Sequence, residues 1–163
     1  MNTDTREVAT LRSILAEGKR ARPYSTNITI RSFKYLIDEP KKLGGEDKAP
    51  TPMEHILGAL NGCFVVTIEM IAREQCYKLT NISIQSEGLI DPRGLFGTAK
   101  VSPHFQRVNI NIEVFADESF KSFDPIKKET IKRCPVYNLI KDSGAIIQVS
   151  WRLNEKVIKS DTI

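Results

Sequence analysis

The residues from 51 to 74, TPMEHILGALNGCFVVTIEMIARE, constrain the fold more than any other stretch of the chain. Thr51 is suited to cap a helix, Pro52 suits the first helical position, and the Glu54 carboxylate can reach back to the Thr51 amide. The residues that follow are apolar on nearly every face of such a helix, which is typical of a helix buried in protein or spanning a membrane. The sequence therefore predicts one helix of about 24 residues, about 36 Å long.

Charged and polar side chains within this segment argue against a membrane span. Glu54, His55, Glu69 and Arg73 leave only a short uninterrupted apolar run, shorter than a bilayer requires. We therefore expect a buried core helix and no membrane partner.

The composition fits one globular domain that covers residues 1–163. The chain is 40% hydrophobic, which is enough to build a core, and 27% charged, which is an ordinary share. The net charge of +4 is mild, and the densest basic cluster, residues 19–22, lacks the interleaved aromatic side chains of a single-strand binding surface. We therefore expect no nucleic-acid partner.

The cysteine content points to a reduced protein without a metal. The 3 cysteines form no CxxC pair and no Cys/His spacing typical of a metal site, so we expect neither a metal nor another cofactor. Residues 1–10 lack the basic and then apolar regions of a signal peptide. This favours a cytoplasmic protein whose thiols are reduced.

The rest of the chain alternates between expected strands and short helices. Residues 8–15 fit a short helix or a first strand, and 38–50 and 88–97 are expected to be loops or turns. The expected strands cover 26–37 (one strand or two short ones), 79–87, 98–101, 108–115 and 145–153, and the expected helices cover 126–133 and 136–143. This order predicts an α+β domain in which antiparallel sheets surround the buried helix.

Two cysteines are candidates for chemistry. Cys63 lies in the apolar stripe of the long helix, where a small buried packing residue is the simpler interpretation. Cys134 directly precedes a helix-starting proline, where free amides and the helix dipole are expected to lower the pKa of a thiol. Lys132 and Arg133 act in the same direction, although a structural role fits Cys134 equally well. Cys76 has no feature that recommends it.

The segment TPMEHILGALNGC and the triplet Cys134-Pro135-Val136 resemble the two cysteine motifs of the OsmC/Ohr family. The loop before the helix and the closing strand fit as well, so the resemblance covers nearly the whole chain. It implies an intertwined homodimer with two active sites near the subunit interface. In the hydroperoxide reductases of this family, the helix cysteine attacks the peroxide and becomes a sulfenic acid. The second cysteine then condenses with it into a disulfide, which an external dithiol reduces.

Carried over by position, the resemblance implies that Cys63 is the peroxidatic nucleophile and Cys134 the resolving thiol. It also implies an arginine from the N-terminal segment that favours the thiolate, because an apolar site alone raises the pKa of a thiol and makes it unreactive. Arg22 fits that position, with Arg20 and Arg31 as alternatives. The implied partners are an organic hydroperoxide, a dithiol reductant and a second copy of the chain.

One position departs from the pattern of the family's peroxidases. These enzymes place a glutamate directly after the helix-start proline, where this chain has Met53, with Glu54 one step later. Nine residues turn a helix by about 900°, so Glu54 is expected to face away from Cys63. We expect Glu54 to be half of a capping box, with a catalytic role as the second interpretation. Met53 also favours an alternative function, a binding protein for an apolar or thiol-bearing ligand in which Cys63 is a packing residue.

The two histidines are weaker candidates. His55 lies about 12 Å from Cys63 along the same helix, too far to act as the base of a Cys/His hydrolase. Within this chain that leaves His104, for which solvent exposure is the simpler expectation.

Overall fold

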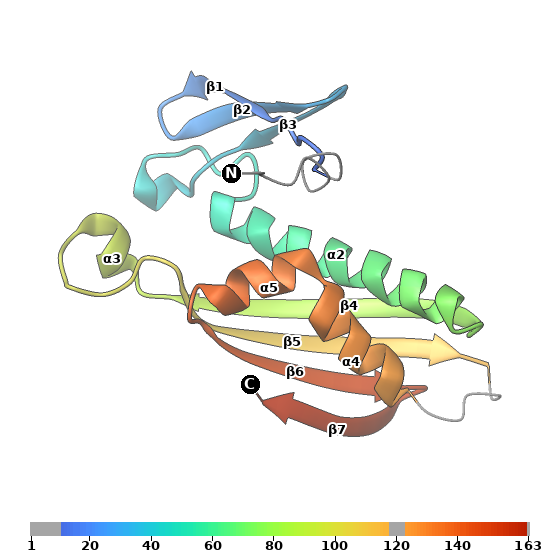
Figure 1. Ribbon diagram of the computed structural model, residues 1–163. Helices are drawn as coiled ribbons and strands as arrows, with labels where there is room; N and C mark the ends of the chain where they lie inside the picture. Colours follow the sequence, from blue (N-terminus) through green and yellow to red (C-terminus); the bar gives the residue numbers. More distant parts are fainter. Residues whose placement is uncertain (1–10, 118–122, 163) are drawn as a thin grey trace, which may run out of the picture. The chain divides into compact units, whose positions relative to one another are not determined.

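The computed structural model describes residues 11–117 and 123–162 of the 163-residue chain. The described chain divides into two compact units, with the boundary between His55 and Ile56. The elements are β1 (Glu17–Arg22), β2 (Ser25–Ile30), β3 (Phe33–Ile37), a 3-10 turn (Lys41–Leu43), α2 (Pro52–Glu74), β4 (Leu79–Ile90), α3 (Pro92–Phe96), β5 (Phe105–Ala116), α4 (Asp124–Arg133), α5 (Pro135–Asp142), β6 (Ile146–Leu153) and β7 (Lys156–Thr162), as labelled in Figure 1. The expectation of a single domain stays a prediction.

The first unit contains an antiparallel sheet in the order β1-β2-β3. The segment expected as one or two strands is a hairpin, because Arg31 at the turn has a φ of 55° that ends β2 and reverses the chain. Tyr24, with a φ of 60°, makes the corresponding turn between β1 and β2. β1 was not predicted, because its sequence EGKRAR shows no apolar alternation and its backbone is ordered by pairing with β2.

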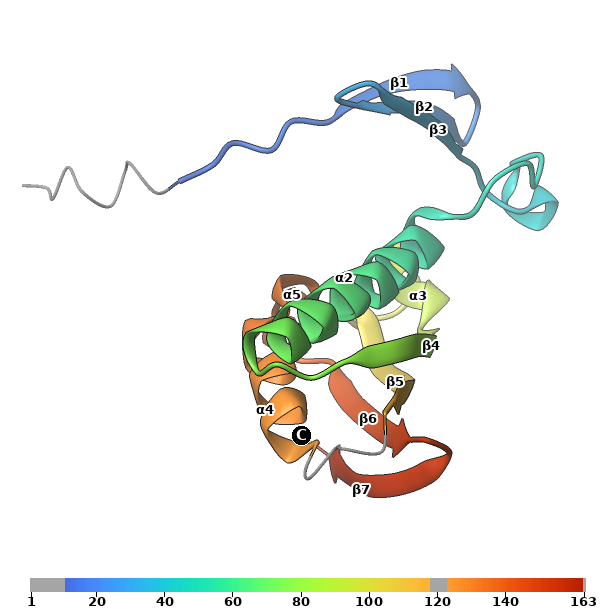
Figure 2. The same ribbon diagram turned by 90° about the vertical axis from the view of Figure 1, so that its right-hand side faces the viewer.

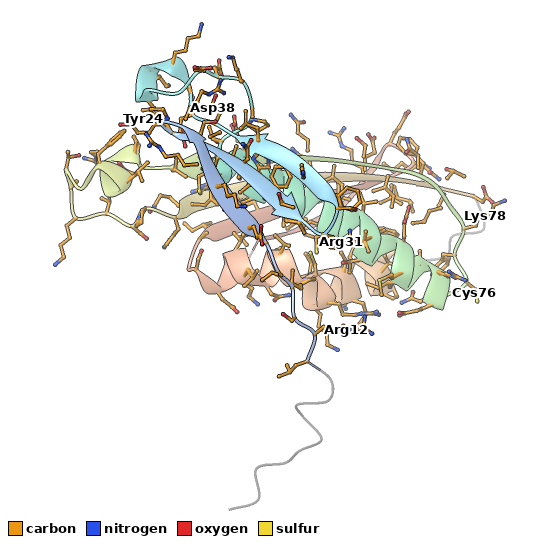
Figure 3. The ribbon with its side chains drawn as sticks, turned by 90° about the horizontal axis from the view of Figure 1, so that it is seen from above. Arg12, Tyr24, Arg31, Asp38, Cys76 and Lys78 are labelled. Atoms are coloured by element: carbon orange, nitrogen blue, oxygen red, sulfur yellow. The ribbon has the colours of Figure 1, made fainter. Side chains whose placement is uncertain are left out.

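A buried carboxylate organises the loop between β3 and α2. Asp38 is fully buried and accepts hydrogen bonds from the backbone amides of Glu39 (2.9 Å), Glu46 (3.3 Å) and Lys48 (3.1 Å). Burial by itself raises the pKa of Asp38, but these amides and the charge of Arg22 outweigh it and hold the pKa below its ordinary value. Figure 3 labels Asp38 at the start of this loop.

The second unit is a mixed sheet covered on one face by helices. The strand order is β4-β5-β6-β7, and α2, α4 and α5 lie on the same side of the sheet (Figures 1 and 2). β5 sends alternate apolar residues into the core: Val108, Ile110, Ile112 and Val114. The sequence predicted antiparallel sheets, but β5 and β6 run parallel, because the chain returns through α4 and α5 to the same end of the sheet.

The long helix α2 forms where the sequence predicted it and buries one face. Leu60, Phe64, Ile68 and Ile71 are completely buried. On another face, Val66 and Met70 are 56% and 51% exposed in the isolated chain, so α2 is less enclosed than its composition predicts. Its length and composition would allow a membrane span, but it packs on one face of the sheet in the manner of a core helix. The predicted α+β class with a long helix is confirmed.

Several local predictions need correction. The segment 98–101 forms turns and bends instead of a strand, and α3 forms within the expected loop at 88–97. The final strand β7 was missed. Of the expected element at 8–15, residues 8–10 lie outside the described residues and 11–15 have no regular structure.

Candidate active site

Two helical elements place two thiols in contact. Cys63 lies midway along α2, and Cys134 lies between α4 and α5. The Cys134 thiol donates a hydrogen bond to the Sγ atom of Cys63 across 3.3 Å, and both cysteines are free. Since the sulfur atoms of a disulfide are about 2.05 Å apart, a small movement would suffice to join them.

A break in the helical backbone sets the position of Cys134. Pro135 has no N–H and cannot continue α4, and Cys134 itself is extended, with φ −69° and ψ 110°. α5 then starts in a new direction and returns to α2, where the rings of Phe64 and Tyr137 meet edge to face with their centroids 5.8 Å apart. The proline and the ring contact together direct the thiol toward α2.

The environment of Cys134 corrects one expectation. The backbone amides of Tyr137 and Val136 do lower its pKa, as predicted for a helix start. Burial has the larger, opposite effect and, together with the contact to Cys63, raises the pKa of Cys134 to about 12. Cys134 is therefore a neutral thiol at physiological pH.

Cys63 is the accessible member of the pair. It is half-buried and lines an open groove of about 490 Å³, whereas Cys134 has no exposed surface. The other residues of this Cys63 groove are Gly62, Val66, Thr67, Met70, Arg133 and Pro135. A small molecule with an apolar body can approach Cys63 along these largely apolar side chains.

Arg133 brings a positive charge to the wall of the Cys63 groove. Its guanidinium binds both carboxylate oxygens of Glu74, at 2.5 and 2.8 Å. This ion pair holds the pKa of Glu74 below its ordinary value. The sequence contains a signal for the position of Glu74. Glu74 lies eleven residues after Cys63, and a helical rotation of about 1,100° places both side chains on the same face of α2.

The other predicted site residues belong to the first unit. Arg22 forms an ion pair with Glu46 at 2.7 Å, and its role beside the thiol stays a prediction. Of its alternatives, Arg20 is exposed on β1 and Arg31 lies over the ring of Phe33, 5.0 Å from its centroid.

Glu54 forms the predicted capping box with Thr51. Its carboxylate accepts from the Thr51 amide at 2.7 Å, and the Thr51 hydroxyl accepts from the Glu54 amide at 3.3 Å. These bonds hold the pKa of Glu54 below its ordinary value. The capping role is confirmed, and a catalytic role for Glu54 stays a prediction.

Both histidine rings are engaged by the backbone. The Nδ1 atom of His55 lies 3.0 Å from the Thr51 carbonyl, and its ring stacks on Tyr35. The Nδ1 atom of His104 lies 2.7 Å from the Phe105 carbonyl. The Cys/His alternative gains no support from these contacts.

Comparisons with known proteins give the class of the fold. The OsmC-like protein from Mycoplasma pneumoniae superimposes with a TM-score of 0.74 at 18% identity, covering 87% of this chain and 97% of that chain. An organic hydroperoxide resistance protein OsmC from Legionella pneumophila gives 0.60 at 18% identity, covering 88% and 98%. An organic hydroperoxide resistance protein from Elizabethkingia anophelis, with thiocyanate bound, gives 0.64 at 16% identity, covering 88% and 96%. A comparison with curated proteins finds no match.

A family model adds sequence evidence to this structural likeness. The model described as OsmC-like protein matches residues 45–150, a span that includes the long helix and both motif cysteines. The chain belongs to the OsmC-like protein family.

Proposed function

We propose that this protein reduces organic hydroperoxides, with Cys63 as the peroxidatic cysteine and Cys134 as the resolving cysteine. The observation that carries the proposal is the difference between two thiols only 3.3 Å apart, of which Cys63 opens on a groove and Cys134 is buried. A peroxidatic cysteine needs access to substrate, whereas a resolving cysteine needs only to reach the first one. The family and the names of several structural neighbours support the same chemistry.

In the proposed reaction, the Cys63 thiolate attacks an oxygen of the peroxide and the O–O bond breaks. The alkoxide leaves and takes a proton to become an alcohol, and Cys63 becomes a sulfenic acid. The sulfur of Cys134 then displaces the hydroxyl group from Cys63. The proton of Cys134 leaves with that group as water, and a disulfide forms.

An external dithiol then reduces the disulfide. One of its thiolates attacks a sulfur of the pair and forms a mixed disulfide, and its second thiol closes on the first to release both protein thiols. We place this cycle in a cytoplasmic homodimer. In it, Arg22 stabilises the Cys63 thiolate and Glu54 is the residue that would orient that arginine.

The test uses cumene hydroperoxide with dihydrolipoamide as the dithiol. We expect turnover by the wild-type protein, loss of turnover in Cys63→Ser, and sulfenic acid accumulating without a disulfide in Cys134→Ser. Cys76→Ser, which removes the exposed third thiol, is the matched control and should retain activity. If the wild-type protein turns over no faster than Cys63→Ser, the proposal is wrong.

A binding function is the second candidate, favoured by the apolar lining of the Cys63 groove and by Met53 in place of the family's glutamate. In that case the groove would hold an apolar or thiol-bearing ligand without chemistry. Mass spectrometry after mild peroxide treatment separates the two candidates. A Cys63–Cys134 disulfide favours the reductase, and unmodified thiols favour the binding protein.

A further inference from the structure

The junction of α4 and α5 breaks the normal pattern of helical hydrogen bonds. In a continuous helix, the carbonyl of Ile131 would accept from the amide of residue 135, but that residue is Pro135 and has no N–H. The carbonyl of Lys132 would accept from the amide of Val136, but that amide hydrogen-bonds to the thiol of Cys134 instead. The carbonyls of Ile131 and Lys132 therefore lose their helical donors.

The side chain of Asn138 supplies the missing donors. Its Nδ2 atom lies 3.2 Å from the carbonyl of Ile131 and 3.2 Å from that of Lys132. The same atom lies 2.9 Å from the carbonyl of Cys134, which also accepts from the Asn138 backbone amide at 3.1 Å. One amide group thus connects the last turn of α4, the cysteine and the first turn of α5.

This bridge has a direct consequence for the Cys134 thiol. With the carbonyl of Lys132 satisfied by a side chain, the amide of Val136 can point at the sulfur of Cys134, as the amide of Tyr137 does. The sulfur in turn points at Cys63, because its hydrogen bond to that thiol is 3.3 Å long. The hydrogen-bonding geometry at this junction therefore fixes the direction of the Cys134 side chain.

We propose that Asn138 is a positioning residue for the resolving cysteine, and that its bridge between α4 and α5 sets the effective concentration of Cys134 toward Cys63. The inference rests on the proposed disulfide chemistry. As a positioning residue, Asn138 acts through the backbone on both sides of Cys134. A misplacement of about 1 Å can reduce the rate or equilibrium of such a step by one to two orders of magnitude.

The test measures the Cys63–Cys134 disulfide at equilibrium in buffers of reduced and oxidised glutathione, in a Cys76→Ser background. Oxidised glutathione is the oxidant, and two molecules of reduced glutathione form for each protein disulfide. We expect Asn138→Leu, which keeps the side-chain size and removes the donors, to lower the effective concentration about tenfold or more. Asn138→Asp also lacks the donors and should lower the effective concentration as well. This variant replaces Asn138→Leu in the test if the leucine variant does not fold.

Asn154→Ala is the matched control for general destabilisation. The Asn154 amide bridges the backbone N–H and C=O of Ala116, both at 3.0 Å, in the same unit but at the end of the sheet. Loss of the Asn154 amide should leave the effective concentration of Cys134 toward Cys63, measured in the glutathione buffers, within about twofold of the wild-type value. Equal effective concentrations in the wild-type and both Asn138 variants would overturn the proposal.

This measurement is independent of peroxide turnover. A protein that forms the disulfide in glutathione but does not reduce cumene hydroperoxide would contradict the proposed function and leave the role of Asn138 intact. Normal turnover of cumene hydroperoxide by the wild-type protein, together with an unchanged disulfide equilibrium in the Asn138 variants, would support the proposed function and contradict the role of Asn138.

Discussion

Two bends of the backbone are each held by one side chain, with opposite hydrogen-bonding roles. In the loop before α2, the Asp38 carboxylate accepts from the amides of residues 39, 46 and 48. At the α4–α5 junction, the Asn138 amide donates to the carbonyls of residues 131, 132 and 134. The first bend presents unpaired N–H groups and needs an acceptor, whereas the second presents unpaired carbonyls and needs a donor.

The difference shows how the choice of side chain controls sensitivity to pH. A carboxylate is the stronger acceptor for several amides, but its contribution depends on its charge. A neutral amide does not titrate, so the bridge beside Cys134 has the same strength across the physiological range. It also adds no charge next to the thiol pair.

The largest expected effect is the loss of stability in Asp38→Asn. The substitution replaces one accepting oxygen with a donor that faces backbone N–H groups, in a fully buried position. Asp47→Asn is the control, because Asp47 is exposed in the same loop. A melting temperature for Asp38→Asn no lower than that of the control would contradict the importance of the carboxylate.

The same variant should change the dependence of stability on pH. Folding lowers the pKa of Asp38, so its contribution is complete above the unfolded-state pKa of about 4 and is lost as the pH falls through the lower folded-state value. We expect the wild-type protein to lose stability more steeply than Asp38→Asn as the pH falls below about 5. Urea unfolding between neutral and acid pH measures both slopes.

The next effect is the loss of stability in Asn138→Leu. Removing the donors leaves carbonyls of the α4–α5 junction without protein partners and should lower the free energy of unfolding by about 1–2 kcal/mol. In contrast to the loss in Asp38→Asn, which should shrink as the pH falls from about 5 to about 3, this loss should be the same at these two pH values. A loss that varied between these two values would contradict the comparison of the two bends.

A smaller effect is expected at the start of α2, where the Thr51 side chain accepts a hydrogen bond from a backbone amide that has no helical acceptor. Thr51→Ala removes the acceptor for the Glu54 amide and should lower stability by about 0.5–1 kcal/mol, because this bond is 3.3 Å long. Thr51→Ser retains the hydroxyl and should stay close to the wild-type value. Thermal unfolding of both variants is the measurement.

The smallest effect concerns the bend that follows α2. Cys76 follows the last turn of α2 (Figure 3) and has a φ of 59°, which is unfavourable for a residue with a Cβ atom. Cys76→Gly should raise stability by about 0.5 kcal/mol, since relief of strain exceeds the added entropy of the unfolded chain. Cys76→Ala keeps the Cβ atom and should show no gain.

Local patterns in the sequence predict much of this fold. The capping box at Thr51 and Glu54 marks the start of α2, alternation marks β5, and Pro135 separates α4 from α5. The strands without such patterns were missed. β1 is a charged segment that becomes a strand only by pairing, and the parallel direction of β6 results from the crossover through α4 and α5.

The sequence by itself determined that two cysteines lie in helical contexts, one within a long apolar helix and one before a helix-starting proline. Only the tertiary structure decided that their sulfur atoms are 3.3 Å apart and that burial outweighs the helix-start amides at Cys134. The two cysteines are 71 positions apart in the sequence, so their meeting depends on how α5 packs against α2. Helix caps and proline breaks act within a few neighbouring residues, whereas distance and desolvation depend on the whole packed unit.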